Sequence, residues 1–247
     1  MAQSHQGRVA ILTGGAGGLG RFFARSLAAA GCDIAIADLA PANEVVEEIE
    51  AMGQRAYSEV CDLADENQIR HFANNVQTTF GRCDILINNA AYMPLIDFKD
   101  LSIAQFRKFE AVNVEASLIL AQCVTPGMVE RGYGRIVQIT SSTVGSPMPG
   151  FLSYVTSKMA GIGLVRALAA EFGDKGVLVN GLSPGLTRTP ESEKNLPPEL
   201  FDAVREKQII KKTQEPEDLC GALLFLTSEN CGFVTGQNLN VDGGHLF

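Results

Sequence analysis

The chain has 247 residues, of which 46% are hydrophobic and 19% charged, and its formal net charge is −8 at pH 7. This length and apolar content allow a large buried core and exclude a disordered chain. The acidic balance disfavours nucleic acid as a partner. No run approaches the ~20 apolar residues that span a bilayer. Residues 1–8 lack the apolar core of a secretory signal, so we expect neither membrane insertion nor export.

The six cysteines are scattered, without a Cys-x-x-Cys pair or a neighbouring group of histidines. This spacing predicts neither a zinc site nor a disulfide framework, so we expect no bound metal. Reduced thiols are typical of the cytosol, and we therefore predict a cytoplasmic protein. The cysteines are Cys32, Cys61, Cys83, Cys123, Cys220 and Cys231.

Short apolar runs alternate with helical segments along the chain. The predicted strands are residues 8–13, 33–38, 55–61, 83–88, 134–140, 177–182 and 238–241. The predicted helices are residues 21–30, 41–52, 65–80, 103–131, 152–172, 198–206 and 216–227. Alternation with continuously apolar strands indicates a parallel sheet covered on both faces. The predicted fold is therefore α/β, a doubly wound parallel sheet of the Rossmann type in three α/β/α layers, forming a single domain over residues 1–247.

Residues 186–212 break this alternation, with Pro190, Pro197 and Pro198, many charges and one short predicted helix. Long irregular insertions in compact domains are usually binding loops or lids. We predict a substrate lid here, and a solvated surface excursion is the alternative.

A glycine-rich turn, TGGAGGLG at residues 13–20, lies between the first predicted strand and helix. It satisfies G-x-G-x-x-G through Gly15, Gly17 and Gly20, and T-G-x-x-x-G-x-G through Gly14, Gly18 and Gly20. Either pattern alone is weak, but the strand–turn–helix context is the one the motif requires. The turn predicts a dinucleotide whose pyrophosphate rests on the helix N-terminus.

Asp38 closes the second predicted strand, eighteen residues after Gly20. A carboxylate there accepts hydrogen bonds from the adenosine ribose hydroxyls and repels a 2′-phosphate. Leu39 is neutral and the turn supplies no cation before Arg21. These residues favour NAD over NADP, with Arg21 as the one nearby cation that could soften the preference.

Tyr154 and Lys158 are four residues apart and share one face of a predicted helix. A nearby ammonium favours a phenolate, so this pair predicts a tyrosine with a lowered pKa that acts as a general acid or base. Ser142 lies upstream, and the intervening loop can return its hydroxyl beside the tyrosine to hold a carbonyl oxygen. This apparatus suits ketone reduction or alcohol oxidation. A tyrosine that merely packs on a lysine stem is the plainer alternative.

The motifs along the whole chain resemble those of the short-chain dehydrogenase/reductases of about this length. In order they are the glycine turn, Asp62-Leu63, Asn88-Asn89-Ala90-Ala91, Asn113, Ser142, Tyr154-x-x-x-Lys158 and Pro184-Gly185. The stretches ADLAPANE, TFGRCDILINNAAYMPL and TGQNLNVDGG are most similar to bacterial NAD-dependent secondary-alcohol dehydrogenases that act on compounds such as 1-phenylethanol.

The resemblance implies a role for each matching position. Tyr154 would be the general acid/base, Lys158 would tune it and hold the nicotinamide ribose, Ser142 would orient the carbonyl, and Asn113 would hold a water in a proton relay. The implied cofactor contacts are Gly14, Gly17, Gly18, Leu19, Gly20, Asp38, Leu39, Asp62, Leu63, Asn89, Ala90, Tyr154, Lys158, Pro184, Gly185, Leu186 and Thr189.

Two positions depart from the family pattern. Ala91 replaces the last glycine of the Asn-Asn-Ala-Gly motif. Both Ser141 and Ser142 could be the catalytic serine, and we choose Ser142 because Ser-x-x-Gly145 matches the family, although the loop to Tyr154 is then one residue shorter than usual.

The predicted substrate contacts are mainly apolar, and no arginine or lysine is expected among them. They are Tyr92, Met93, Val144, Met148 and Phe151, with Ser142 and Tyr154 at the reacting carbon. We predict NAD(H)-dependent conversion of a neutral, hydrophobic or aromatic secondary alcohol and its ketone, by a homotetramer as is general in the family. The alternatives are an NADPH-dependent 3-oxoacyl-thioester reductase, a steroid or sugar dehydrogenase, and a non-catalytic relative.

Overall fold

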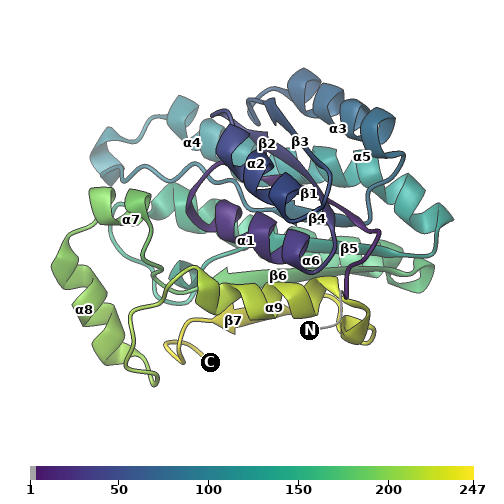
Figure 1. Cartoon of the computed structure of the whole chain (residues 1–247). Helices are drawn as coiled ribbons and strands as arrows, with labels where there is room; N and C mark the ends of the chain where they lie inside the picture. Colours follow the sequence, from purple (N-terminus) through teal and green to yellow (C-terminus); the bar gives the residue numbers. More distant parts are fainter. Residues whose placement is uncertain (1–3) are drawn as a thin grey trace.

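The computed structural model describes residues 4–247, so residues 1–3 of the expected domain lie outside it. Its centre is a seven-stranded parallel sheet in the order β3-β2-β1-β4-β5-β6-β7 (Figure 1). The strands are β1 Val9–Thr13, β2 Asp33–Asp38, β3 Ala56–Val60, β4 Ile85–Asn88, β5 Gly134–Ile139, β6 Val177–Pro184 and β7 Asn238–Val241. The order reverses between β1 and β4, which confirms the predicted doubly wound α/β fold.

Helices cover both faces of the sheet (Figure 1). They are α1 Gly18–Ala29, α2 Asn43–Ala51, α3 Glu66–Phe80, α4 Ile103–Glu110, α5 Ala116–Glu130, α6 Leu152–Phe172, α7 Pro190–Asn195, α8 Pro198–Lys207 and α9 Glu217–Thr227. Side chains of α1, α2 and α9 form one apolar core with the sheet. Those of α3, α5 and α6 form a second core on the opposite face. The continuously apolar strands β1, β2 and β4 are buried because both of their faces are covered.

Local sequence explains where individual elements begin and end. Asp65 caps α3, since its carboxylate accepts from the backbone N–H groups of Asn67 and Gln68 at 2.9 and 3.4 Å. Gly81 ends the same helix with φ of 73°, a left-handed conformation that favours glycine. The parallel strands bring their carboxyl ends, including Thr13 and Asp38, to one edge of the sheet.

Two predicted elements differ from the structure. The helix expected over residues 103–131 is divided by a π-helical turn, Ala111–Glu115, between α4 and α5. Residues 186–212 hold two helices instead of one, because Thr189 caps a short helix that Pro190 opens. The α7–α8 segment projects from the body at one end of the molecule (Figure 1).

The run Ile103–Glu130 has the length and the mean hydropathy, 1.3, of a membrane-spanning helix. In the structure its α5 part packs in the core between α3, β4 and β5. Its apolar composition is that of a core helix in an α/β domain.

Candidate active site

A cavity of ≈ 930 Å³ opens at the carboxyl edge of the sheet. Most predicted site residues line it. These are Gly14, Gly17, Gly18, Leu19, Asp38, Leu39, Asp62, Leu63, Asn89, Ala90, Tyr92, Met93, Ser142, Met148, Phe151, Tyr154, Lys158, Pro184, Gly185, Leu186 and Thr189. Gly20, Asn113 and Val144 are not part of the lining. One cavity therefore joins the glycine turn to the Tyr154–Lys158 pair.

The glycine turn is shaped to carry a phosphate group. Gly14 has φ of 67° and Gly18 has φ of 52°, and α1 begins at Gly18 with its N-terminus at the cavity. A Cβ on Gly20 would lie 1.9 Å from the Gly14 carbonyl oxygen, so this glycine permits close packing within the turn and does not reach the cavity. Backbone N–H groups at a helix N-terminus suit a pyrophosphate, so the turn fits a dinucleotide.

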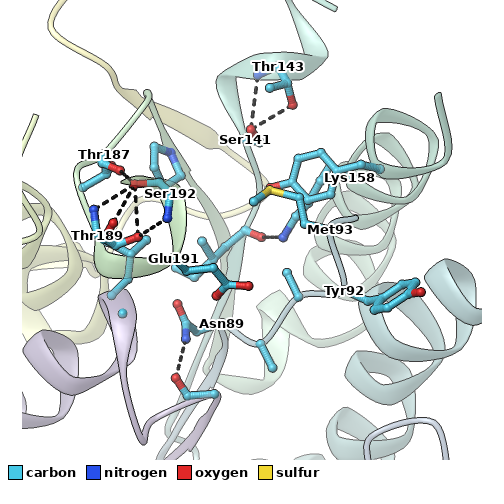
Figure 2. Close-up of a pocket in the computed structure, with 18 of the residues that line it drawn as sticks. Asn89, Tyr92, Met93, Ser141, Thr143, Lys158, Thr187, Thr189, Glu191 and Ser192 are labelled. Carbon is cyan, nitrogen blue, oxygen red and sulfur yellow. Dashed lines mark hydrogen bonds between the residues drawn. The ribbon is translucent and has the colours of Figure 1, made fainter. Parts of the chain in front are cut away.

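Asn89 ties the glycine turn to the loop after β4. Its Nδ2 donates to the carbonyl oxygens of Thr13 and Gly14, both at 3.0 Å, and Figure 2 shows Asn89 on the cavity wall. Thr13 Oγ1 in turn accepts from the backbone N–H groups of Asn89 and Ala90 at 3.0 and 3.1 Å. Gly14 is also required here, since a Cβ would come within 2.9 Å of Ala90 Cα. These bonds fix the turn before any ligand binds.

Asp38 is held in a single orientation at the end of β2. Its Oδ2 accepts from the Ala16 N–H at 2.8 Å and its Oδ1 accepts from the Ala40 N–H at 3.0 Å. Arg21, the one nearby cation of the sequence prediction, forms ion pairs with Glu44 at 3.2 Å and Glu48 at 2.5 Å. These ion pairs hold the Arg21 guanidinium, the cation that could otherwise bind the 2′-phosphate of NADP.

Tyr154 and Lys158 are both buried on the first turns of α6. Burial raises the pKa of Tyr154 to about 12 and lowers the pKa of Lys158 to about 8. The expected lowering of the Tyr154 pKa by Lys158 is therefore not found. Lys158 Nζ lies 5.5 Å from the Tyr154 ring centroid and donates to the Ile139 carbonyl oxygen at 2.7 Å. At neutral pH this phenol holds its proton and can donate it to a ketone oxygen.

The serine beside Tyr154 is Ser141. Its side chain forms a hydrogen bond that opposes burial and lowers the pKa of the Tyr154 phenol. Figure 2 shows Ser141 with Thr143 directly above it, and both residues line the cavity. Ser142 also belongs to the lining, so both serines remain candidates for the catalytic serine. The contact that lowers the pKa of the phenol favours Ser141 over the predicted Ser142.

Asn113 lies in the π-helical turn, behind the cavity wall. Its Oδ1 accepts from the Tyr92 N–H at 2.8 Å, and its Nδ2 donates to the Tyr92 carbonyl and to Ser157 Oγ at 3.1 and 2.9 Å. The amide therefore joins the loop after β4 to α6. Both polar atoms of the Asn113 side chain are hydrogen-bonded to protein, so only its backbone groups could bind a water of a proton relay. The π-helical turn interrupts the α-helical hydrogen bonding at this point.

The substrate end is less uniformly apolar than the sequence predicts. Met93, Met148 and Phe151 line it, but the Tyr92 ring points away from Ser141 and Lys158 (Figure 2) and packs against Phe109 at 4.8 Å. The expectation that no lysine lines the site is wrong. The lining that sequence reasoning missed includes Lys108, Thr143, Ser146, Glu191, Ser192, Val204, Lys207 and His245.

Lys207, Glu191 and His245 come from segments whose position relative to the sheet could not be predicted from the sequence. Lys207 lies on the same face of α8 as Leu200, Ala203 and Val204, because these four residues have helical spacing. The helical period alone would have predicted Lys207 in the lining if the sequence had shown that this helix packs against the site. Glu191 belongs to α7, and its carboxylate reaches the space between Thr189 and Met93 (Figure 2). His245 comes from the chain after β7.

Residues 14–245 match the family model described as enoyl-(acyl carrier protein) reductase. The 7alpha-hydroxysteroid dehydrogenase of Escherichia coli K12 is 35% identical over 240 residues, which cover 96% of this chain and 94% of that protein. The chain belongs to the short-chain dehydrogenase/reductase family. This membership confirms the resemblance and makes the chain an oxidoreductase. Solved structures of similar chains hold NADH or NADP.

Other members show how varied the family is. A (2S)-[(R)-hydroxy(phenyl)methyl]succinyl-CoA dehydrogenase subunit of Thauera aromatica is 36% identical, covering 97% of this chain and 96% of that protein. A 7alpha-hydroxysteroid dehydrogenase solved with NADH and 7-oxo glycochenodeoxycholic acid has a TM-score of 0.94 at 34% identity, covering 98% of this chain and 95% of that one. A putative NAD(P)-dependent gluconate 5-dehydrogenase from Beutenbergia cavernae, solved with NADP, has a TM-score of 0.92 at 33% identity and covers 99% of both chains.

Proposed function

We propose that this enzyme transfers a hydride between NAD(H) and a secondary alcohol or ketone with an apolar or aromatic body. The observation that carries the proposal is the single cavity that joins the glycine turn and Asp38 to the buried Tyr154 and Lys158. When bound, NAD(H) would accept or supply the hydride. Tyr154 gives its proton to the ketone oxygen in reduction and takes it back in oxidation.

The neighbouring residues have supporting roles in this proposal. Ser141 donates a hydrogen bond to the carbonyl oxygen, replacing Ser142 in the role predicted from the sequence. Lys158 places a positive charge beside the phenol and the nicotinamide ribose. Asn113 holds the loop that carries Tyr92 and Met93 against α6. Gly14, Gly18 and Leu19 would hold the pyrophosphate, Asp62 and Leu63 the adenine, and Pro184 to Thr189 the nicotinamide.

NAD is the proposed cofactor because of Asp38 and the engagement of Arg21. The relatives do not decide this point, since solved structures of similar chains hold NADH in one case and NADP in another. Asp38 lines the cavity with its carboxylate fixed by two backbone N–H groups. A 2′-phosphate would meet a fixed negative charge there and find Arg21 already paired.

The α7–α8 segment within residues 186–212 is the proposed lid. Its residues Leu196, Leu200 and Val204 line the cavity, and together with Met93, Met148 and Phe151 they favour an apolar or aromatic substrate. The substrate named for the Thauera relative is a phenyl-bearing secondary alcohol and also an acidic CoA thioester, so it is compatible both with this class and with an acyl-thioester substrate. Lys108 and Lys207 at the same cavity favour one second candidate, an acyl-thioester reductase whose substrate is acidic.

Two properties outside the site are also proposed. Exposed apolar side chains on α5 and α6, including Leu118, Leu152 and Met159, support the homotetramer. All six cysteines are free thiols, which supports a cytoplasmic location.

The deciding experiment titrates the purified protein with NADH and NADPH by nicotinamide fluorescence, and then screens aryl and alkyl secondary alcohols. We expect NADH to bind at least ~10-fold tighter, a difference of about 1.4 kcal/mol. Equal or tighter binding of NADPH, with activity only on thioesters, would replace the proposal by the second candidate.

A further inference from the structure

The chain after β7 is folded into a fixed turn by Asp242, a residue buried to 2% exposure. Its Oδ1 accepts from the N–H groups of Gly244 and His245 at 3.0 and 3.1 Å, and its Oδ2 accepts from the N–H of Leu246 at 3.1 Å. Gly243 and Gly244 have φ of 68° and 76°, which only glycine adopts readily. Because the buried carboxylate accepts hydrogen bonds from three backbone N–H groups, it fixes the conformation of this C-terminal turn, residues 242–246.

The C-terminal turn contacts both the proposed lid and the loop after β5. Gln208 Nε2 donates to the Asp242 carbonyl oxygen at 3.0 Å, and the Ile210 N–H donates to the Gly243 carbonyl oxygen at 2.9 Å, so the base of the lid is fastened to it. On the other side Leu246 fills the space above Gly145, where a Cβ would come within 2.6 Å of Leu246 Cδ1. His245 is thereby held between the lid and the loop that carries Ser141.

The His245 ring lines the cavity. Nδ1 of the ring is enclosed by protein without a hydrogen-bond partner, so a ligand in the cavity cannot reach it. Nε2 is the ring nitrogen left for a ligand, and it has no hydrogen bond to protein among residues 4–247. A neutral imidazole presents Nε2 as a donor or as an acceptor according to its tautomer, and a hydroxyl group can pair with either form.

We propose that His245 is a substrate-contacting residue, which hydrogen-bonds a hydroxyl substituent on the substrate remote from the reacting carbon. The inference rests on the proposed function, and it narrows the substrate to an apolar or aromatic body that carries a second polar group. The lid contributes the apolar Leu200 and Val204 to the same cavity, together with Lys207, whose ammonium supplies donors only. A site with an unpaired hydrogen-bonding group selects for ligands that satisfy it.

The test compares acetophenone with para-hydroxyacetophenone by calorimetry, in the presence of saturating NAD⁺, so that no turnover occurs. The wild-type protein should bind the hydroxyketone about 5-fold tighter, the effect of one hydrogen bond. His245→Phe should reduce this ratio to near one, and His245→Gln, which keeps a donor and an acceptor, should retain part of it. NADH affinity and the thermal unfolding midpoint should not change.

His71→Phe is the matched control, because His71 is a surface histidine of α3 with a side chain 70% exposed. It should keep the wild-type ratio. An unchanged ratio in His245→Phe, or equal binding of the two ketones by the wild-type protein, overturns the inference and leaves the proposed function intact. Failure of the wild-type protein to bind either ketone overturns both.

Discussion

The hydroxyl oxygens of Ser141 and Thr143 lie 2.9 Å apart, and the Thr143 backbone N–H donates to the same Ser141 oxygen at 3.2 Å. Two donors on one hydroxyl oxygen occupy its acceptor positions, so the Ser141 proton is left for the Tyr154 oxygen or for a ligand beside it. The pair therefore presents a donor to a carbonyl oxygen beside Tyr154.

This arrangement predicts that the two adjacent serines are not equivalent. Ser141→Ala should lower kcat for ketone reduction about 100-fold, the loss typical of one donor to a developing oxyanion. Ser142→Ala should lower it less than about 10-fold, because the hydrogen bond that acts on the Tyr154 phenol comes from Ser141. Steady-state kinetics of both variants decide the matter, and the reverse order of effects would restore Ser142 as the catalytic serine.

Thr143 should act through Ser141. In Thr143→Val the shape is kept but the hydroxyl is lost, and kcat should fall about 10-fold, in line with one orienting hydrogen bond. The double variant Ser141→Ala/Thr143→Val should be no slower than Ser141→Ala alone, since the two residues act as a unit. Additive losses in this double-mutant cycle would show that Thr143 acts independently.

Tyr154→Phe should lower turnover by roughly 10²–10⁴-fold if the phenol has its proposed role as the proton donor. NADH binding, followed by fluorescence, should remain within about 2-fold of the wild-type value since the ring still packs on Phe151. Loss of both properties together would point to misfolding, and retained turnover would favour the non-catalytic alternative for this tyrosine. Val155→Ala, at the next position of α6, serves as the packing control.

The sheet and its cofactor turn were predictable because each rests on short-range patterns. The apolar runs from Val9 and Asp33 and the glycines of residues 13–20 encode a strand, a tight turn and a buried parallel sheet without reference to the rest of the chain. Helix α7 was missed because a helix of six residues is too short to show an apolar period. Thr189 followed by Pro190 is nevertheless a helix-start signal.

The substrate end was less predictable because it depends on contacts between distant segments. Whether Ser141 or Ser142 meets Tyr154 depends on how the loop 143–151 folds, and motif spacing alone does not decide between the two hydroxyls. Lys207 and His245 reach the cavity only because Gln208 and Asp242 join the lid to the C-terminal turn. No local pattern around either residue signals that contact.

Lys158 should reduce the stability of the fold while serving the reaction. Its pKa of about 8 lies below the ordinary value of 10.5, so holding the charged form in the buried site costs about 3 kcal/mol at neutral pH. Between pH 8 and 10.5 the folded protein releases this proton before the unfolded chain does, and the cost declines as pH rises. Lys158→Met should remove the cost but leave the Ile139 carbonyl without its donor.

Denaturant unfolding at pH 7 and pH 9.5 measures this effect. The stability of Lys158→Met relative to the wild-type protein should fall by about 2 kcal/mol between these pH values, since only the wild-type protein gains from deprotonation. Comparing the variant with the wild-type protein at each pH cancels the titration of other groups, including Tyr154, whose raised pKa adds stability that is lost only above pH 10. A difference that stays constant with pH would contradict the lowered pKa of Lys158.

Asp38 and Glu48 should act on cofactor choice by different routes. Asp38→Asn keeps an oxygen for the Ala16 N–H but removes the charge, so the preference for NADH over NADPH should drop from at least ~10-fold to near one.

Glu48→Gln leaves Asp38 in place and removes the charge from the strongest ion-pair partner of Arg21. If the freed guanidinium reaches the adenosine end, NADPH affinity should rise about 3-fold with NADH affinity unchanged, the effect of one partly exposed ion pair. Glu47→Gln on the same helix is the control, because Glu47 forms no ion pair among residues 4–247. Since one route removes repulsion and the other adds attraction, the Asp38→Asn/Glu48→Gln double variant should bind NADPH tighter than either single one. A Glu48→Gln protein with wild-type affinities would show that Arg21 lies beyond the reach of the 2′-position and that Asp38 alone sets the preference.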